Sequence, residues 1–343
     1  MKKIISMLAV AVMAVSALSS CVDDAEVTAY MTPEVKDEIA TNNPEKIFAA
    51  AVAGIHSDIQ SYVYSDYSHN YFGQKSFDYL TSLQGNDMVM TGRYAMSLYH
   101  YLFDFWQEPY KATSNRWRQY YRLVDSANQI LSSISEDASD PTSLKYKATA
   151  LAVRGYAYLH LSYLYGLPYY MGADDTVWGK GQKYDNSAAL CVPIVTETIT
   201  GDQPRSTNAQ VYEQLMGDLK GAYDIFNGLG MEKTATPTDI DGCFAAMYLA
   251  RAHMIKHEWS EAAKYADVII KNVPIMTSAS DILQGFSSLN LPNIVYGCDI
   301  TSDNSTIYMS WFSQMDMFGD GYAAIGVARV AHNYLVESIS DTD

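Results

Sequence analysis

The chain has 343 residues, of which 39 are acidic and 23 are basic, and its formal net charge is −16. A surface this acidic repels phosphate backbones, which argues against nucleic acid as a partner, and a chain of this length can bury a substantial core in one large domain or two smaller ones. Cys191, Cys243 and Cys298 lie far apart in the sequence, so they form neither the pattern of a disulfide framework nor that of a zinc site. We predict that each is a small, buried, apolar side chain.

The N-terminus has the pattern of an export signal. Lys2 and Lys3 precede a continuous apolar run, which at about fifteen residues is shorter than the roughly 20 that cross a bilayer as a helix. Residues 18–21, "LSSC", match the lipobox of bacterial lipoproteins. We therefore predict a cleaved signal peptide over residues 1–20 and lipid attachment at Cys21, which anchors the mature chain without spanning the membrane. An ordinary secretory signal with an incidental cysteine is the alternative.

An acidic tether over residues 21–43 is predicted to lead into helices. Pro44 suits the first position of a helix over residues 44–63. A second helix is predicted to start after Ser114 or Asn115, and a third to open at residues 140–141, "DP", and to close at residues 166–168, "GLP". Because the connection "SEDASD" is short and polar, these two long helices should form an antiparallel hairpin. The apolar positions with helical spacing are Trp117, Tyr121, Val124 and Leu131, then Ala150, Val153, Ala157, Leu161 and Leu164.

Three further helices follow the same pattern. One carries Tyr212, Leu215, Leu219, Ala222 and Phe226 on one face. The next two flank a tight turn at Trp259 and end before Pro274, which resembles a tetratricopeptide unit and predicts that it stacks on the other helices.

Two irregular regions, residues 167–206 and 275–330, are expected to carry short strands, and loops this long in a compact domain are usually functional or disordered. The predicted fold is therefore mostly α-helical, with tetratricopeptide-like hairpins, long irregular loops and a few short strands.

Five segments in this order also carry a family resemblance: "RWRQYYRLVDSANQIL", "KATALAVRGYAYLHLSYLYGLPYY", "PRSTNAQVYEQLMGDLKGAYDIF", "AAMYLARAHMIKHEWSEAAKYADVII" and "NIVYG". Together, behind a lipobox, they resemble the SusD/RagB family of nutrient-binding lipoproteins of the bacterial outer-membrane surface. The resemblance covers residues 21 to about 343 and implies a SusD-like helical domain over residues 44–343. Members of that family usually continue well beyond this length, so we expect the C-terminal part of the family's fold to be missing here.

The resemblance implies a function without chemistry. The protein is expected to capture an oligosaccharide and deliver it to a SusC-like TonB-dependent outer-membrane transporter, with no cofactor. Acids directly after the lipid-bearing cysteine, as in "CVDDAE", resemble the family's signal for export to the cell surface. Peptide capture of the RagB kind, a tetratricopeptide scaffold without a small ligand and a surface hydrolase remain as alternatives.

Candidate ligand residues follow from sugar chemistry, because sugars stack apolar faces on aromatic rings and present hydroxyls to amides and charged groups. Residues 83–110 combine such groups, and Tyr308 and Trp311 form a second set that alternates like a strand face. Core packing is the alternative for each ring, and it is the interpretation that we favour for Trp117 and Trp259. The candidates in residues 83–110 are Asn86, Asp87, Arg93, Tyr94, Tyr99 and Trp106.

Catalytic and metal motifs are weak. His253 and His257 lie one helical turn apart, but the stretch "HMIKHE" lacks the internal glutamate of the zinc-protease signature. The paired acids in "GADD" and "CDITSDN" lack the ordered spacing of a calcium loop. No nucleophile elbow or phosphate loop is found, so we predict neither enzymatic activity nor a metal site.

Overall fold

The computed structural model describes residues 44–60, 72–85, 88–91, 111–171, 184–197, 201–285, 287–301, 308 and 310–340. The chain divides into two compact units, Met1–Ile47 and Phe48–Asp343, and all contacts discussed below lie within the second. No helix in the described ranges combines the length and the apolarity that a membrane span requires.

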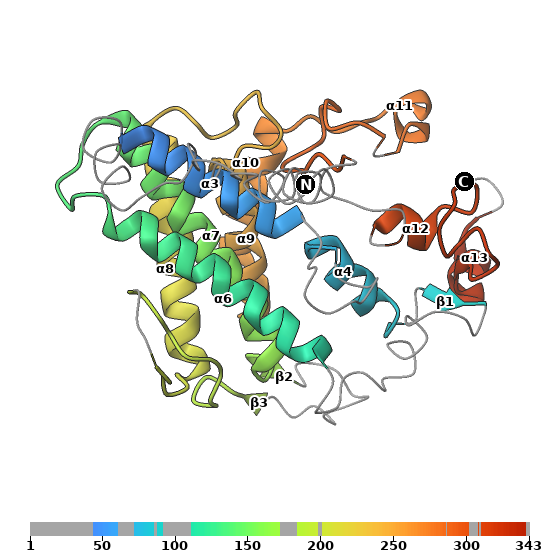
Figure 1. The fold of residues 1–343 in the computed structure, drawn as a ribbon, viewed down its shortest axis with the longest axis horizontal. Coiled ribbons are helices and arrows are strands. Elements are labelled where there is room, and N and C mark those ends of the chain that lie inside the picture. The colour runs from blue at the N-terminus through green and yellow to red at the C-terminus, as the bar shows by residue number, and fades with distance from the viewer. Residues whose placement is uncertain are drawn as a thin grey trace, which may run out of the picture. The chain divides into compact units, whose positions relative to one another are not determined.

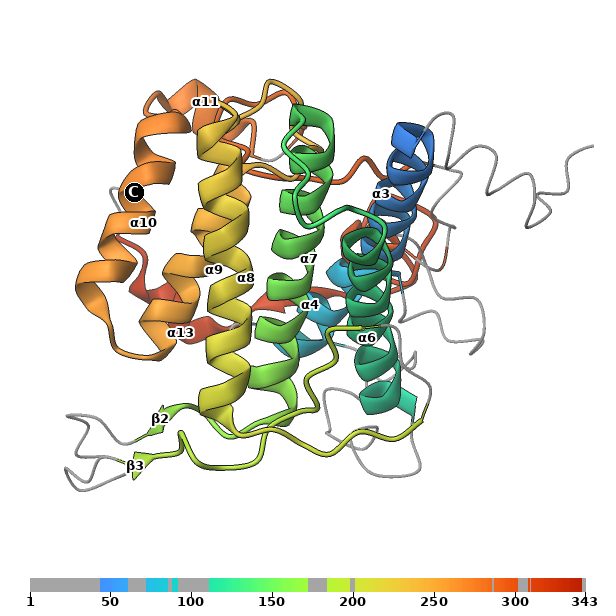
Figure 2. The same ribbon diagram turned by 90° about the vertical axis from the view of Figure 1, so that its left-hand side faces the viewer.

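Five long helices pack side by side as an array, in the order of the chain (Figure 2). Each contacts the next, so the array consists of helical hairpins as predicted, and the last pair is the tetratricopeptide-like unit. These helices are α6 Lys111–Ser132, α7 Pro141–Tyr165, α8 Asn208–Gly228, α9 Gly242–Ile255 and α10 Trp259–Asn272. Two further helices, α3 Pro44–Gln60 and α4 Gln74–Ser82, precede the array in the chain (Figure 1).

Local signals fix where most of these helices begin. Asp140 caps α7 by accepting a hydrogen bond of 2.8 Å from the Ser143 backbone N–H, and Pro141 occupies the first turn as predicted. Thr207 and Gln210 form a reciprocal capping box at the start of α8.

The predicted start of α6 is wrong, because Ser114 and Asn115 lie inside the helix, which begins at Lys111. The Tyr165 hydroxyl donates to the Thr113 carbonyl, and this contact with α7 stabilises the extra turn. Tertiary packing therefore overrides the capping preference of Ser and Asn.

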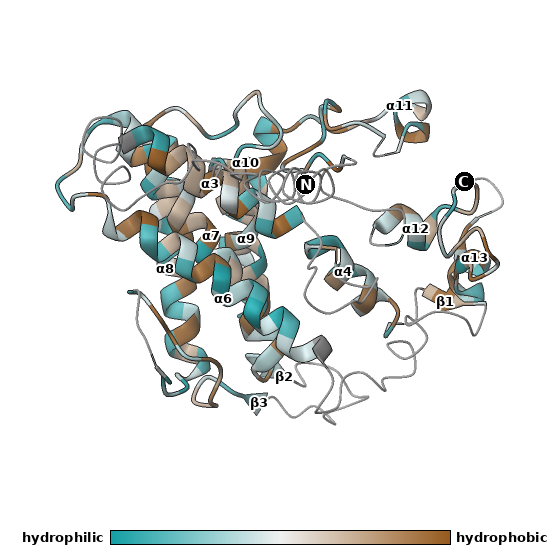
Figure 3. Cartoon of the chain, in the orientation of Figure 1, coloured by the Kyte–Doolittle hydropathy of each residue, from teal (hydrophilic) through white to brown (hydrophobic). Residues whose placement is uncertain are grey.

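Helix α7 is buried on all sides rather than along one face. The predicted apolar positions from Ala150 to Leu161 are buried, but so are Tyr156 and Tyr158 on other faces. The reason is that α7 contacts α6, α8 and α9 at once. Figure 3 shows the contrast with α6, where hydrophilic and hydrophobic residues alternate.

The C-terminus of α7 requires its glycine for an unexpected reason. Gly166 has φ −98°, outside the left-handed region of a typical C-terminal glycine. A β-carbon there would lie 2.5 Å from the Ser162 carbonyl oxygen and 2.7 Å from Cys191 Sγ. The residue is needed because the chain comes very close at this point, and Cys191 is buried and free as predicted.

Gly155 determines how closely α7 approaches α8. A β-carbon at Gly155 would lie 2.6 Å from Leu219 Cγ and 3.0 Å from the Leu215 carbonyl oxygen, part of the α8 backbone. We expect Gly155→Ala to lower the free energy of unfolding by about 1–3 kcal/mol, because the helices would have to separate. Urea unfolding measures this.

The matched control is Gly217→Ala in α8, where a β-carbon meets nothing within 4 Å. This variant should be more stable than the parent by about 0.5–1 kcal/mol, since Ala loses less backbone entropy than Gly in a helix. Equal effects of the two substitutions would contradict the packing argument.

Short strands join distant parts of the chain. Strand β1 Met88–Met90 pairs antiparallel with β4 Arg329–Ala331, and β2 Tyr170–Met171 pairs antiparallel with β3 Tyr184–Asp185. The strands β2 and β3 confirm the prediction for residues 167–206.

The predicted strand face at Tyr308 and Trp311 is wrong. Ser310 caps a short helix, α12 Trp311–Met315, by accepting from the Ser313 backbone N–H at 3.1 Å. Because the Ser310 side chain satisfies a backbone N–H in the first turn, it favours the start of a helix here over an extended strand. The remaining short helices of this region are α11 Ala279–Leu283 and α13 Asn333–Ser338.

Candidate functional site

Most of the ligand residues predicted from sequence lie outside the described residues, as does the predicted lipidation site Cys21. Tyr308 and Trp311 are described, and their exposed fractions are 47% and 36%. The Tyr308 ring lies 5.9 Å from the Tyr322 ring, whereas Trp311 lines a cavity. Of these two candidates, Trp311 is the one that lines the cavity. The predicted residues outside the described ranges are Asn86, Asp87, Arg93, Tyr94, Tyr99 and Trp106.

The cavity that Trp311 lines has a volume of about 440 Å³. It lies where four parts of the second unit meet: the ends of α3 and α4, the buried helices α7 and α9, the segment 288–300 and the start of α12. A cavity of this size falls within the range of small-molecule sites. We refer to it as the Trp311 cavity.

Aromatic rings form much of its wall. The Lys75 ammonium lies 5.6 Å from the Trp311 ring centroid, in cation–π range, and the Phe312 ring stands edge-on to Trp311 at 5.8 Å. On the helix side, Phe244 packs against Tyr248 at 4.9 Å and against Tyr296 at 5.1 Å. The cavity thus presents flat apolar surfaces beside a cationic group.

A glutamine orients the polar part of the cavity. The Gln74 side-chain oxygen accepts hydrogen bonds from the hydroxyls of Tyr120 and Tyr156, at 2.8 and 2.7 Å. Its amide nitrogen donates to Asp78 Oδ1 at 2.9 Å. Because both acceptor positions are occupied by buried tyrosines, the amide has one orientation and fixes the Asp78 carboxylate.

The pKa of Asp78 is raised above its ordinary value. The largest cause is loss of hydration in the cavity, and the hydrogen bond from Gln74 and the positive charge of Lys75 oppose it. The Asp78 side chain is nevertheless exposed, so a ligand in the cavity can reach its carboxylate. The same geometry suits it to accept hydrogen bonds from hydroxyl groups.

A neutral histidine lies behind the wall. The His160 ring stacks on Tyr120 at 4.9 Å, and its Nδ1 lies 3.1 Å from the Tyr120 hydroxyl oxygen. Burial, helped by the charges of Arg251 and Arg116, lowers the pKa of His160 to about 3. The ring is therefore uncharged at neutral pH, and the tyrosines around it keep their protons, since burial raises the pKa of Tyr156 well above its ordinary value.

The described residues that line the cavity include one carboxyl group. That group belongs to Asp78, whereas glycoside hydrolysis uses two carboxyl groups about 5–9.5 Å apart. Within the described ranges no group of three or more His, Cys, Asp or Glu side chains is placed to hold a metal ion. His253, from the histidine pair noted in the sequence, bonds instead to Glu258 at 2.7 Å.

Sequence reasoning missed the residues that build this site. Gln74 and Asp78 are one helical turn apart on α4, which was not predicted as a helix, and neither Tyr156 nor Tyr248 was among the ligand candidates. The spacing of Gln74 and Asp78 is the one local signal that pairs them. Nothing local connects that helix to Trp311.

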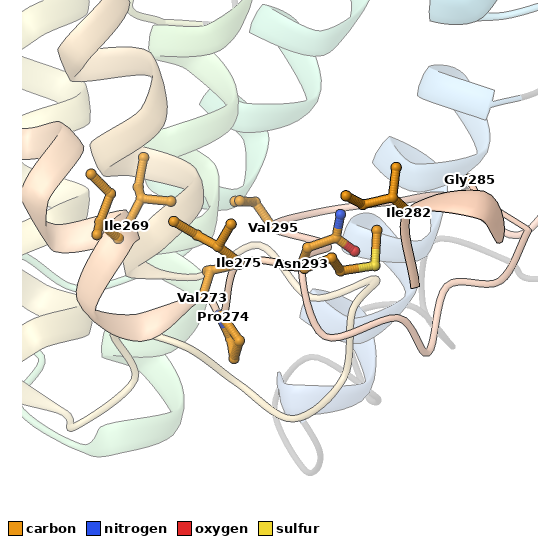
Figure 4. A pocket seen from close by; sticks show the side chains of 10 residues that line it. Ile269, Val273, Pro274, Ile275, Ile282, Gly285, Asn293 and Val295 are labelled. Atoms are coloured by element: carbon orange, nitrogen blue, oxygen red, sulfur yellow. The ribbon is translucent and has the colours of Figure 1, made fainter. Parts of the chain in front are cut away.

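A second cavity, of about 400 Å³, lies beside the C-terminus of α10 (Figure 4). Its labelled walls are aliphatic, with Ile269, Ile275 and Ile282 pointing toward it and Asn293 as the polar exception. Without aromatic rings or charged groups among its described lining residues, it is a poorer match to a sugar than the Trp311 cavity.

Comparison with known proteins points to one family. A family model for SusD-like proteins, described as starch-binding and associating with the outer membrane, matches residues 31–236. No curated protein matches the chain. The match covers more than half of the sequence and includes the helices α3 to α8.

Several solved structures share the fold. A SusD-like carbohydrate binding protein from Bacteroides vulgatus is 22% identical, with a TM-score of 0.63 over 79% of this chain and 53% of that chain. A SusD superfamily protein from Bacteroides thetaiotaomicron is 22% identical, with a TM-score of 0.58 over 76% of this chain and 54% of that chain. Surface glycan-binding protein A from the same species, solved with laminarihexaose, is 15% identical, with a TM-score of 0.61 over 87% of this chain and 61% of that chain. The present chain thus spans little more than half the length of these proteins.

Proposed function

The chain belongs to the SusD-like family of starch-binding proteins that associate with the outer membrane, and from this membership we propose that it captures an oligosaccharide at the cell surface without cleaving it. A SusC-like TonB-dependent transporter is the proposed recipient. We further propose that residues 1–20 are a signal peptide, that Cys21 carries the lipid, and that residues 21–43 tether a SusD-like domain over 44–343.

The observation that carries this proposal is the chemistry of the Trp311 cavity. An indole and a phenyl ring offer stacking surfaces, and Lys75, Gln74 and Asp78 supply donors and acceptors beside them. Sugar rings need both kinds of contact, because one face is apolar and the hydroxyls lose water on binding. The relative that was solved with laminarihexaose supports a glycan as the ligand.

We expect Trp311→Ala to weaken oligosaccharide binding by at least about tenfold, because a tryptophan ring that a bound ligand covers typically contributes much of the binding energy. Isothermal titration calorimetry with a panel that includes laminarihexaose and maltohexaose would measure this. The matched control is Phe318→Ala, which removes an aromatic ring that is fully exposed and does not line the cavity. Its affinity should equal that of the parent.

The same samples separate the alternatives. Intact oligosaccharide after long incubation is expected, and released shorter sugars would identify a hydrolase instead. Binding of short peptides but of no sugar would favour peptide capture. Equal binding by the Trp311→Ala and parent proteins would move the ligand site away from this cavity.

A further inference from the structure

A second aromatic surface lies at the turn between α9 and α10. Trp259, for which we predicted a structural role, is 60% exposed, so its indole is not part of the buried core. Its indole stacks nearly parallel on the His257 ring, with centroids 5.1 Å apart and 16° between the planes. Tyr170 of β2 lies 5.3 Å from the His257 ring. We call Tyr170, His257 and Trp259 the aromatic row; none of them lines the Trp311 cavity.

The middle ring of the aromatic row is held by an unusual backbone. His257 has φ 58°, and it is the one non-glycine residue of the described ranges with a positive φ. A side chain with a β-carbon costs free energy in this conformation, for which glycine or asparagine is the usual choice. The turn is nevertheless closed by hydrogen bonds from the backbone N–H groups of His257 and Glu258, to Met254 at 3.0 Å and His253 at 2.9 Å. A glycine at this position would avoid the strain but would leave no ring against the indole, whereas histidine provides the ring and strains the backbone.

Charged residues adjoin the aromatic row in the chain. Glu258 lies between His257 and Trp259 in the chain, and its carboxylate bonds to the Lys256 ammonium at 2.6 Å. The same ammonium lies 5.8 Å from the Tyr169 ring centroid. The exposed indole therefore follows a carboxylate directly in the chain, and that carboxylate pairs with an ammonium.

This combination favours a sugar over a protein partner. A protein interface centres its aromatic anchors in a wide, water-excluding apolar patch. Here Ser260 and Glu261, which follow the indole directly, are exposed and polar. An exposed indole that stacks on a second ring and has charged and polar residues beside it in the chain matches a sugar ring, whose apolar face is edged with hydroxyls.

We propose that the aromatic row is a second carbohydrate-binding surface, on which the apolar face of a sugar ring stacks against the exposed indole of Trp259. This inference rests on the proposed function and adds a site to it. Two weak sites on one molecule hold a polysaccharide more tightly than either site holds a short oligosaccharide, provided that one chain reaches both. The surface would therefore matter most for polymeric glycan.

Fluorine NMR can detect ligand binding at the Trp259 and Trp311 sites separately. Protein labelled with 5-fluorotryptophan gives one ¹⁹F resonance for each of its 5 tryptophans, and Trp259→Phe and Trp311→Phe assign the two that matter. We expect the Trp259 resonance to shift when laminarihexaose, maltohexaose or xylohexaose is added at millimolar concentration. The Trp117 resonance should stay in place, because that ring packs between Tyr121 and Tyr165.

A variant pair separates binding from folding. We expect Trp259→Ala to weaken binding of the corresponding polysaccharide about tenfold, the amount expected for the loss of one good stacking contact. His257→Gly relieves the backbone strain while it removes the supporting ring. It should therefore unfold at a higher urea concentration than the parent and still bind the polysaccharide less tightly. A purely structural histidine would give the higher stability without the loss of binding.

The outcomes are distinct. A Trp259 resonance that no sugar moves, together with a Trp311 resonance that shifts, overturns the second surface and leaves the proposed function intact. If neither resonance moves, both proposals fail. A Trp259 resonance that responds to added short peptides, and to no sugar, also overturns the assignment, because the row would then be a protein contact.

Discussion

Replacement of Arg154 by alanine is expected to lower the free energy of unfolding by about 3–5 kcal/mol, the typical effect of leaving a buried charge unpaired. The Arg154 guanidinium donates to both carboxylate oxygens of Asp218 at 2.8 Å and to Asn128 Oδ1 at 2.8 Å. Its side chain is 9% exposed and that of Asp218 is 5% exposed. The group joins α7, α8 and α6, so urea unfolding of the variant should show a clear loss of stability.

Two controls make the result specific. Arg122→Ala breaks an ion pair with Asp58 of similar length, 3.0 Å, but the Arg122 side chain is 52% exposed. Solvent screens that pair, and the expected loss is below about 1 kcal/mol. The double variant Arg154→Met, Asp218→Leu removes both charges and should recover most of the stability. If Arg154→Ala and Arg122→Ala cost the same, the buried pair is not a stabilising junction.

The stability of the protein should also fall steeply in mild acid, and His160 is expected to account for a large part of the fall. Burial lowers the pKa of His160 from 6.5 to about 3 in the folded chain. Below pH 6.5 the unfolded chain binds a proton that the folded chain does not bind, so acidification favours unfolding. The expected contribution is about 1.4 kcal/mol for each pH unit between the two pKa values.

His160→Phe tests this assignment while keeping a ring against Tyr120. We expect the dependence of the unfolding free energy on pH between 6.5 and about 4 to become shallower in this variant. His56→Gln should change it less, because burial lowers the pKa of His56 as well but the Asp239 carboxylate opposes the shift. An unchanged slope in His160→Phe would mean that the imidazole takes up its proton in the folded state.

Local patterns predicted most of the helical array. The pair Asp140–Pro141 and the glycine at 166 marked both ends of α7, and helical spacing identified the buried face of α8. These signals depend on residues that are close in the sequence, so they can be recognised without knowledge of the fold. The same reasoning failed at Ser114, because the extra turn of α6 depends on Tyr165, which is distant in the sequence.

The site was harder to predict. Trp311 was identified from its residue type, but Gln74 and Asp78 were not, because their role depends on α4 meeting α12 across more than two hundred residues of chain. The exposure of an aromatic ring is likewise a tertiary property. Trp117, inside α6, packs between two tyrosines as predicted, whereas Trp259, the first residue of α10, is exposed.

The sequence by itself determined the helical hairpins, because short-range periodicity and caps specify them, and its ordered motifs carried the family resemblance that implied a glycan. Only the tertiary structure decided which aromatic rings are available to a ligand. It made α7 the buried centre of the array, brought Trp311 beside Lys75, and left Trp259 open against His257. The physical reason is that solvent exposure and site geometry are set by contacts between segments, and such contacts leave no periodic trace in either segment alone.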